Sequence, residues 1–395
     1  MTHPRTSLLR VLLAAGGTAG HVFPAIAVSK QLEALGTTCA LIGSSGGMEE
    51  RLAKEANLEF YGVRSGKIDR SRPDPRAVWN ALAGFGDAVA VTRKFKPDVT
   101  VGFGGFASFP GVAAAWLTRT PLVMHEANAY PGLVTRTFKG VSRAIALADA
   151  AGTAHLSSEK CTVVGMPVRE GRLEGREARI QLGLEPDLLT VLVMGGSQGS
   201  VALNRLLPDL LIRTLEGQGV QVLHQTGRGR LGEVQPKVAH LPWYHCAEFV
   251  DGIAAWSAAS YAITRAGMST IADAAFHGVP LLLIPLPSSS EDHQVSNAKS
   301  VQMRGAGRWY AQGDLEAGLN EGFTRGMLEC LQPEILTAMR AAALQHSPVG
   351  AAERLASLIV TVGSSGNAGS SGSALRHQIP SDQTPKNQTS KDRAP

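Results

Sequence analysis

A glycine-rich turn of one form occurs twice in this chain of 395 residues, and it limits the possible folds more than any other feature. The first copy is GGTAG at 16–20 and the second is GGSQG at 195–199. Each copy follows an apolar run of strand length and precedes an amphipathic helical pattern. Two strand–turn–helix units about 180 residues apart predict two similar Rossmann-like domains, with both turns opening into a crevice between them.

The alternation of strands and helices continues through both halves and predicts an α/β fold with parallel sheets. The expected strands are rich in aliphatic residues and are 8–15, 39–43, 99–101, 121–125 and 144–148 in the first half, then 188–194, 220–225, 246–251, 261–264 and 281–284 in the second. In open sheets of this kind, ligands bind beyond the carboxyl ends of the strands. The loops that follow the strands are therefore the places where a site is expected.

The first glycine turn is followed by His21 at the expected beginning of a helix. The turn has neither the G-x-G-x-x-G spacing of a dinucleotide site nor the G-K-[ST] of a P-loop. The helix dipole disfavours the charged form of an imidazole at a helix start, which keeps the ring available as a general base. The alternative is a histidine that caps or packs locally, and the residues alone leave both interpretations open.

A second centre lies in residues 261–298, where a strand, a loop and a helix follow one another. Ser269 is expected to be the N-cap of this helix, and Asp273 to lie in or near its first turn. The free N–H groups at such a helix start bind phosphate oxygens, and a nearby carboxylate can accept both hydroxyls of a ribose. Alternatively, Asp273 only complements the helix dipole.

Polar residues also follow two other strands. His125, Glu126 and Asn128 come directly after one strand of the first half. The cluster EDHQ at 291–294 follows the strand at 281–284 in the second half. Because the carboxyl ends of parallel strands meet at one edge of a sheet, both groups are expected to face the same crevice.

Composition places the chain among globular proteins and leaves the class of partner open. Hydrophobic residues make up 44% of the sequence, and the four cysteines form no C-x-x-C pair, which argues against a zinc ribbon or redox motif and indicates a reducing compartment. No apolar run approaches the roughly 20 residues needed to cross a bilayer. A net charge of +5 with a pI near 9.1 suits nucleic acid, acidic lipid or a phosphorylated substrate.

Residues 64–96 concentrate the positive charge, with eight basic and three acidic residues. Val78, Trp79, Leu82 and Phe85 form an apolar stripe on the helix expected there. A basic rim around an apolar stripe allows a soluble protein to rest on an anionic membrane surface. A stripe that faces the core, with solvated charges around it, is the alternative of equal weight.

The expected domain organisation follows from these patterns. Residues 1–168 are expected to form an N-terminal Rossmann-like domain, and residues 169–348 a C-terminal Rossmann-like domain. A break at 347–350 lets the last helix, 349–361, cross back to the first domain. Residues 363–395 are rich in Gly, Ser, Pro and polar residues and are expected to be disordered.

Several blocks in a fixed order connect the chain to a known family. Residues 265–298 carry R-x-G-x-x-T-x-x-[ED], G-x-P and H-Q-x-x-N-A, and GGTAGHVFPA, GFGGFASFPG, HEANAYPGLVTR, VVGMPVR and LVMGGSQGS precede them. This set resembles the MurG family, the glycosyltransferases that attach N-acetylglucosamine to lipid I in bacterial cell-wall synthesis. The resemblance implies a GT-B fold and inverting transfer of N-acetylglucosamine (GlcNAc) from UDP-GlcNAc to the 4-hydroxyl of the N-acetylmuramic acid (MurNAc) residue of lipid I. The product would be lipid II for peptidoglycan synthesis.

The resemblance also assigns roles to residues at matching positions. His21 is implied as the general base, with Glu126 as the second candidate. The donor site is implied to consist of Thr18, Ala19, Gly20, Asn128, Arg169, Ser197, Val250, Met268, Ser269, Thr270, Asp273 and Gln294. The sequence departs from the family twice, because the family usually has Gly at Ala19 and Glu at Asp273. An alanine at 19 is harmless only where φ is negative, and the shorter Asp273 needs a closer backbone or a bridging water to reach ribose.

Within this donor site, the resemblance divides the ligand among the residues. Arg169, the backbone at Val250 and the ring of Phe249 would hold the uracil end, and Asp273 would hold the ribose. Ser197 and residues 268–270 would meet the diphosphate, whereas Asn128 and Gln294 would orient the sugar; Thr18 and Gly20 would face the acceptor's diphosphate and the donor sugar. No D-x-D motif occurs in the sequence, so we expect helix-start N–H groups, without a metal or other cofactor, to neutralise the leaving diphosphate.

The expected partners are UDP-GlcNAc, lipid I and an anionic membrane surface, which places the chain peripherally on the cytoplasmic side of the plasma (inner) membrane. Two alternatives remain open at this point. One is a related GT-B enzyme with another lipid-linked or soluble acceptor, and the other is a nucleotide-binding membrane scaffold without catalysis. A nucleic-acid binder is disfavoured, since no recognition motif accompanies the local positive charge.

Overall fold

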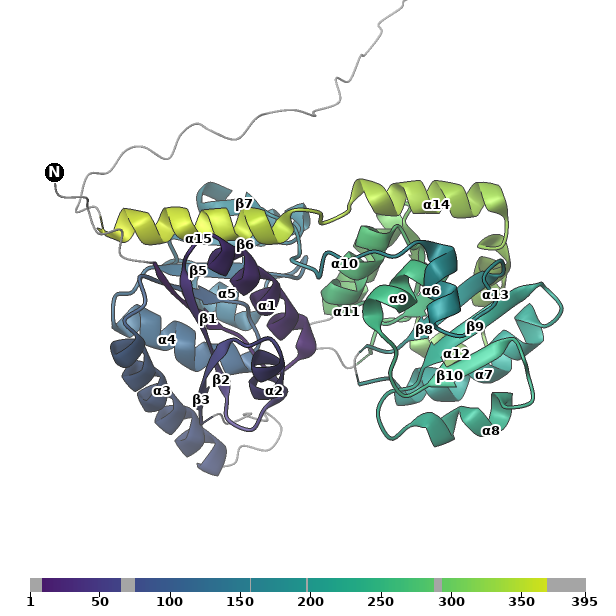
Figure 1. Ribbon diagram of the computed structural model, residues 1–395, viewed down its shortest axis with the longest axis horizontal. Coiled ribbons are helices and arrows are strands. Elements are labelled where there is room, and N and C mark those ends of the chain that lie inside the picture. The colour runs from purple at the N-terminus through teal and green to yellow at the C-terminus, as the bar shows by residue number, and fades with distance from the viewer. Residues whose placement is uncertain (1–8, 65–74, 157, 197, 288–292, 368–395) are drawn as a thin grey trace, which may run out of the picture.

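The computed structural model describes residues 9–64, 75–156, 158–196, 198–287 and 293–367, which form two α/β lobes (Figure 1). The first strand, β1 (Arg10–Ala14), shows why its sequence is continuously apolar. Val11 and Leu13 enter one hydrophobic cluster, whereas Leu12 and Ala14 enter another on the opposite face. Both faces of the sheet are therefore covered by helices, as is usual for parallel sheets.

The N-terminal lobe contains a seven-stranded sheet in the order β3-β2-β1-β4-β5-β6-β7. All of its pairings are parallel; in register, Val11 lies opposite Cys39 on one side and Val99 on the other. The other strands are β2 (Thr38–Ser44), β3 (Glu59–Val63), β4 (Val99–Gly102), β5 (Leu122–Glu126), β6 (Ala144–Leu147) and β7 (Cys161–Val163). The strand order reverses between β1 and β4, so a ligand crevice is expected at the carboxyl ends of these two strands.

Helices cover the two faces of this sheet. The helices of the lobe are α1 (Ala19–Ala34), α2 (Met48–Glu55), α3 (Pro75–Phe95), α4 (Phe109–Leu117) and α5 (Leu133–Phe138). Buried side chains of α1 and α2 join the cluster that contains Val11, and those of α3, α4 and α5 join the cluster that contains Leu12.

The C-terminal lobe repeats this plan with a six-stranded parallel sheet in the order β10-β9-β8-β11-β12-β13. Its strands are β8 (Leu189–Met194), β9 (Val220–Gln225), β10 (Tyr244–Ala247), β11 (Tyr261–Thr264), β12 (Leu281–Leu283) and β13 (Gly307–Trp309). Its helices are α6 (Gly175–Gln181), α7 (Val201–Leu215), α8 (Gln235–Val238), α9 (Gly252–Ala258), α10 (Met268–His277), α11 (His293–Met303), α12 (Gln312–Glu316), α13 (Glu321–Glu329) and α14 (Pro333–Gln345). The order now reverses between β8 and β11, the strands that lead into the second glycine turn and into α10. The predicted α/β fold with two parallel sheets is confirmed.

The last helix, α15 (Ala351–Asn367), leaves the C-terminal lobe and packs along the N-terminal one (Figure 1). Ala352, Leu355 and Ile359 are buried in the same cluster as Val11, so the predicted return of the chain is confirmed. The helix includes residues 363–367, and the remainder of the segment expected to be disordered, 368–395, lies outside the described residues.

Some predicted details differ from the structure. The strand expected at 246–251 is β10 at Tyr244–Ala247, and Asp251 instead caps α9 by accepting a hydrogen bond of 2.9 Å from the Ala254 N–H. The predicted stripe on α3 divides, because Leu82 is exposed whereas Phe85 packs against the core; the side chains of Val78 and Trp79 lie outside the described part. Among the described helices, none is both long and apolar enough to cross a bilayer.

Candidate active site

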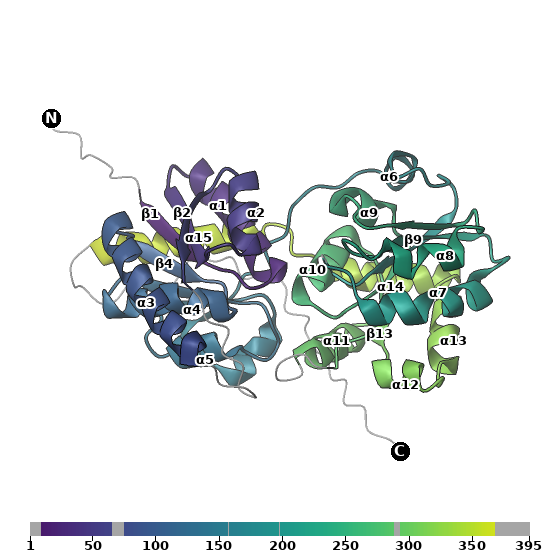
Figure 2. The same cartoon turned by 90° about the horizontal axis from the view of Figure 1, so that it is seen from below.

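Helix α1, which follows β1, and helix α10, which follows β11, begin close to each other across the boundary between the lobes. A Cβ placed on Gly20, near the start of α1, would lie 3.4 Å from the Ser269 Oγ near the start of α10. Figure 2 shows α1 and α10 on facing sides of this boundary. The first glycine turn and the loop after β11 therefore open into one crevice, which is where a ligand can touch both lobes.

His21 lies in the first turn of α1 and is held by its neighbours. Its Nδ1 hydrogen-bonds with the Thr18 Oγ1 at 2.9 Å, and its ring packs against the loop at Gly104 and Gly105. Burial lowers the pKa of His21 from its ordinary 6.5 to about 4, and a hydrogen bond with the backbone of Gly16 offsets part of that effect. The ring is therefore neutral at pH 7, mainly because of burial and not because of the helix dipole on which the sequence argument relied.

Glycine is required at several points around His21 and in the second glycine turn. Gly105 has a φ of +75°, and a Cβ there would lie 2.9 Å from the His21 Nδ1. Gly199 has a φ of +73°, and a Cβ there would lie 2.0 Å from the backbone oxygen of Thr226. The glycines thus allow backbone to approach closely where a side chain would collide. Ala19 is the first residue of α1 and has no positive φ, so its methyl group is tolerated.

Glu126 ends β5 and organises the loop that follows it. Its Oε1 accepts hydrogen bonds from the Asn128 backbone N–H at 2.9 Å and from the Asn128 Nδ2 at 3.2 Å. Its Oε2 accepts a hydrogen bond of 2.9 Å from the Gly132 N–H. The buried carboxylate is therefore occupied by protein donors, and it orients the Asn128 amide. His125, its neighbour, is buried beside Phe103 and does not line the crevice.

The start of α10, which was expected to bind phosphate, differs from the prediction in one respect. Gly267, with φ −73° and ψ 139°, is the N-cap of α10, so Ser269 is the second helical residue and the prediction that it is the N-cap was wrong. Gly267 has no side chain that could cap, and the Thr18 side chain does not cap α1. By contrast, Ser200 caps α7 by accepting from the Leu203 N–H. In the described part of the chain no side chain caps these two helix starts, although the His21 N–H donates to the Thr18 backbone oxygen at 3.1 Å. The N–H groups of Ala19 and Gly20 and those of the first turn of α10 can therefore meet another acceptor.

Asp273 is the sixth residue of α10 and lies in its second turn, two residues further from the helix start than an N-cap at Ser269 would have placed it. Burial raises the pKa of its carboxyl from the ordinary 3.8 to about 7, and the positive charge of Arg169 opposes this rise. The Arg169 guanidinium stacks over the Phe23 ring at 5.3 Å and passes close to Gly252 at the start of α9. Val250 lies just before this helix and is buried, whereas its neighbour Phe249 is 74% exposed.

Gln294 and Arg265 hold the loops around the start of α10. The Gln294 Oε1 accepts from the backbone N–H of Ala266 at 3.2 Å and from that of Leu286 at 2.9 Å, which leaves the Nε2 group to point elsewhere. Arg265 donates to the Ile284 backbone oxygen, the Ser200 Oγ and the Gln312 Oε1. The sequence motif included Arg265 without a role; the structure shows that it ties the second glycine turn to the end of β12. Ser197 lies outside the described residues.

Comparison with known proteins identifies the family. Two domains of glycosyltransferase family 28 match the chain, the N-terminal domain at residues 11–147 and the C-terminal domain at residues 190–355. A UDP-N-acetylglucosamine–N-acetylmuramyl-(pentapeptide) pyrophosphoryl-undecaprenol N-acetylglucosamine transferase of Deinococcus deserti is 46% identical over 382 residues, which cover 88% of this chain and 97% of that protein. The chain belongs to this transferase family. The protein of the same name from Thermus thermophilus is 39% identical and covers 88% of this chain and 98% of its own length.

A solved structure supports the same assignment to the MurG family. The crystal structure of Acinetobacter baumannii MurG has a TM-score of 0.70 and 30% sequence identity, and the match covers 89% of this chain and 99% of that one. The resemblance and the GT-B fold expected from the sequence are thus confirmed. The individual site residues remain predictions, although the structure brings Thr18, His21, Asn128, Asp273 and Gln294 to the loops and helix starts that face the boundary between the lobes.

Proposed function

We propose that the chain transfers GlcNAc from UDP-GlcNAc to the 4-hydroxyl of the MurNAc residue of lipid I, with inversion at the anomeric carbon, so that lipid II forms. The observation that carries this proposal is the apposition of two helix starts across the lobes. The start of α1 presents a neutral His21, and the start of α10 presents N–H groups that no side chain caps. A general base and an anion-binding site on opposite sides of one crevice are what a displacement that releases a diphosphate requires.

The donor lies along the C-terminal lobe in this proposal. Arg169 and the backbone at Val250, with Phe249 beside them, take the uracil end, and Asp273 takes the ribose. The donor's diphosphate binds at the start of α10 through Met268, Ser269 and Thr270, together with Ser197. Thr18 and Gly20, with Ala19 between them, face the donor sugar and the acceptor's diphosphate. The Asn128 amide, oriented by Glu126, and the Nε2 group of Gln294 orient the sugar. Glu126 then acts by positioning Asn128, because its oxygens already accept three protein hydrogen bonds.

The reaction is a single displacement at the anomeric carbon of GlcNAc. The 4-hydroxyl of the acceptor attacks while its proton passes to His21, and the bond between that carbon and the diphosphate oxygen breaks with both electrons leaving on UDP. Because the Nδ1 of His21 already hydrogen-bonds with Thr18, the Nε2 is the atom that accepts the proton. A diphosphate bound near the ring would raise the pKa of His21 from about 4 towards the working pH, because negative charge favours the imidazolium.

The leaving diphosphate is neutralised by the protein itself. The N–H groups at the starts of α1 and α10, with about half a positive charge at each helix start, supply fixed dipoles where negative charge develops. Turnover is therefore expected to be unchanged after treatment with EDTA. A loss of turnover that magnesium restores would overturn this part of the proposal.

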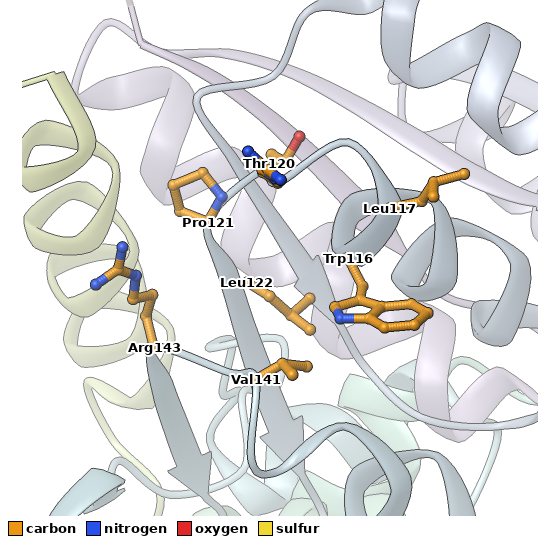
Figure 3. A pocket seen from close by; sticks show the side chains of 8 residues that line it. Trp116, Leu117, Thr120, Pro121, Leu122, Val141 and Arg143 are labelled. Atoms are coloured by element: carbon orange, nitrogen blue, oxygen red, sulfur yellow. The ribbon is translucent and has the colours of Figure 1, made fainter.

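We also propose that the N-terminal lobe rests on an anionic membrane surface, on the cytoplasmic side of the plasma (inner) membrane, where lipid I is reached. A surface cavity of about 410 Å³ lies at the end of α4 (Figure 3). Trp116, Leu117 and Val141 line it and are 58%, 53% and 49% exposed, and Arg119 and Arg143 lie beside them. Exposed apolar side chains with neighbouring cations are the combination that binds the interface of an anionic bilayer.

The test of the reaction is a transfer assay with UDP-GlcNAc and a soluble lipid I analogue. Formation of the disaccharide product with release of UDP is expected. Turnover with another acceptor but none with the lipid I analogue would favour a related transferase. UDP-GlcNAc binding without transfer to any acceptor would favour the scaffold.

A further inference from the structure

Helix α11 belongs to the C-terminal lobe, yet one of its faces contacts the N-terminal lobe with polar side chains. His293, Asn297 and Ser300 follow one another at intervals of four and three residues, which places them on one side of the helix, and Arg304 comes directly after its last residue, Met303. The His293 ring lies 5.9 Å from the Tyr130 ring, the Ser300 Oγ lies 3.5 Å from the Asp149 Oδ2, and Arg304 forms an ion pair of 2.6 Å with Asp149. The two lobes therefore meet along α11 through polar contacts.

Asn297 is the most buried member of this face, at 1% exposure, and its amide is used on both sides of the boundary. Its Nδ2 donates to the Ala266 backbone oxygen at 3.2 Å, within its own lobe. The same Nδ2 donates to the Asn128 Oδ1 at 3.5 Å, and its Oδ1 accepts from the Ala129 N–H at 3.4 Å, in the other lobe. One side chain thus links the loop before α10 to the loop after β5.

The Asn128 amide is consequently held at both of its ends. Glu126, from the same lobe, accepts from the Asn128 Nδ2, and Asn297, from the other lobe, donates to the Asn128 Oδ1. The direction in which this amide points depends on both contacts, because an amide between a fixed acceptor and a fixed donor cannot turn without losing one of them. Only the contact with Asn297 depends on the distance between the lobes.

We infer that Asn297 is a positioning residue that sets the Asn128 amide on the donor sugar when the lobes are together. This inference rests on the proposed function. Gln294 lies one turn earlier on α11, so a single helix places both of the amides that orient the sugar: Gln294 directly, and Asn128 through Asn297. Displacement of the sugar by about 1 Å can cost about a hundredfold in rate, which makes such a contact matter for turnover.

A purely structural role for Asn297 would give different results. Its bond to the Ala266 oxygen fixes the residue before Gly267, the N-cap of α10. If that were its whole purpose, loss of the amide would disturb the diphosphate seat, and UDP and UDP-GlcNAc would lose affinity equally. If Asn297 acts through Asn128, only the ligand that carries the sugar loses affinity.

The test compares the variants Asn297→Ala and Asn297→Asp with the wild-type protein, all made as the whole chain. Calorimetry gives the affinities for UDP and UDP-GlcNAc, and an assay with a lipid I analogue gives kcat and KM. Asn297→Asp retains an acceptor for the Ala129 N–H but cannot donate, so two carboxylates would compete for the Asn128 Nδ2. Ser300→Ala is the matched control, because it removes an interlobe contact on the same face without touching Asn128.

Both variants at position 297 are expected to lower kcat by about 10- to 100-fold and to lower the affinity for UDP-GlcNAc at least about fivefold. The affinity for UDP should stay within about twofold of the wild-type value. In the background of Asn128→Ala, the change Asn297→Ala should cost no more than about a further twofold, because contacting residues that act as a unit are not additive. Ser300→Ala should turn over at the wild-type rate.

Three results would overturn the inference: full turnover by Asn297→Asp, equal losses for UDP and UDP-GlcNAc, or an additive loss in the Asn128→Ala background. Circular dichroism and thermal melting show whether each variant folds. If Asn297→Ala does not fold, Asn297→Asp, which keeps the side-chain volume, carries the test alone. If the wild type transfers nothing to the lipid I analogue, the proposed function fails. The comparison of UDP-GlcNAc with UDP still tests the inference in that case.

Discussion

At the scale of single residues, the site depends on groups whose protonation is set by burial. The His21 ring stays neutral because its charged form would lose hydration, and the Asp273 carboxyl holds its proton at an unusually high pH for the same reason. A neighbouring anion would raise the pKa of His21, whereas hydrogen bonds from ribose hydroxyls would lower the pKa of Asp273. The two residues therefore give separable predictions.

Replacing His21 by alanine is expected to lower kcat by about 10²–10⁴-fold, which is the usual contribution of a general base. The donor should still bind with an affinity within about twofold of wild type, because UDP-GlcNAc is proposed to lie mainly on the other lobe. Single-turnover kinetics and calorimetry measure the two quantities. His240→Ala, at an exposed position of the C-terminal lobe, is the control and should have no effect. Wild-type turnover by His21→Ala would remove the proposed base.

Asp273→Asn is expected to weaken UDP-GlcNAc binding and yet to stabilise the fold at high pH. Between pH 3.8 and about 7 the folded protein retains a proton that the unfolded chain releases, so this group's contribution to stability falls as pH rises through that window. Above pH 7 the wild type carries the full cost of a poorly hydrated charge, which the neutral amide avoids. We expect a gain of about 1–3 kcal/mol at pH 8 and almost none at pH 3.5.

Thermal melting at the two pH values checks the prediction for Asp273. Asp187→Asn is a control of opposite sign, because the ion pair with Arg176 lowers the pKa of the Asp187 carboxyl. That variant should be slightly less stable than wild type at pH 8. If Asp273→Asn melts below wild type at pH 8, burial of the charged carboxylate does not destabilise the fold.

At the scale of helices, strands and turns, much of the fold could be predicted because it depends on local pattern. The strand at Tyr261–Thr264 matched the expectation from sequence, and α10 ends at Gly278, whose φ of +69° is a conformation that glycine adopts readily. The start of α10 did not match the expectation, since the preference of serine for the N-cap was overridden by the extended backbone of Gly267. That difference matters for function, because an uncapped start keeps its N–H groups for a ligand.

Contacts between the lobes could not be predicted from pattern. Asn297 and Ala129 are 168 residues apart in sequence, and Arg304 and Asp149 are 155 apart. Neither pair belongs to a periodic signal, so only the relative placement of the two lobes brings them together. The motif H-Q-x-x-N-A marked Asn297 as part of a block but gave no physical reason for it.

The turn that contains Gly104 and Gly105 is expected to be as necessary for turnover as the glycine turn at 16–20. Gly105→Ala would place a methyl group 2.8 Å from the Gly16 oxygen and 2.9 Å from the His21 Nδ1 in a left-handed backbone conformation. The ring must shift, and kcat should fall at least about tenfold. Gly183→Ala is the matched control, because its φ of +70° is similar but no other atom lies within 4 Å of the added carbon.

Gly183→Ala should lose about 1–2 kcal/mol of stability to its positive φ alone. Gly105→Ala should lose more, because a φ of 75° with a ψ of 158° is a conformation almost confined to glycine and the methyl group would meet the Gly16 oxygen. Only Gly105→Ala should also lose turnover. Urea unfolding and the transfer assay separate the two effects. Equal turnover of the two variants would show that the loop at Gly105 does not hold His21 in place.

At the scale of the whole molecule, the two lobes expose different surfaces. The C-terminal lobe carries the seats proposed for a soluble nucleotide sugar, and the N-terminal lobe exposes Trp116, Leu117 and Leu82. Since α15 returns to the N-terminal lobe and Arg304, directly after α11, pairs with Asp149 of that lobe, the two lobes are linked both by the chain and by side chains. A membrane-bound N-terminal lobe would then leave the other lobe free to exchange UDP for UDP-GlcNAc.

Replacing Trp116 by glutamate should reduce binding to vesicles of anionic phospholipid at least about fivefold, because it removes a large apolar contact and adds a charge that the surface repels. Flotation or sedimentation with vesicles at two salt concentrations measures this, and wild-type binding should weaken as salt rises. Leu319→Glu makes the same kind of change at a residue that is 69% exposed on the other lobe, so it should bind like wild type. Transfer to a soluble acceptor analogue should be equal in all three proteins, since the cavity at the end of α4 lies away from His21. If Leu319→Glu lost as much vesicle binding as Trp116→Glu, the contact would be a matter of net charge and not of a surface on the N-terminal lobe.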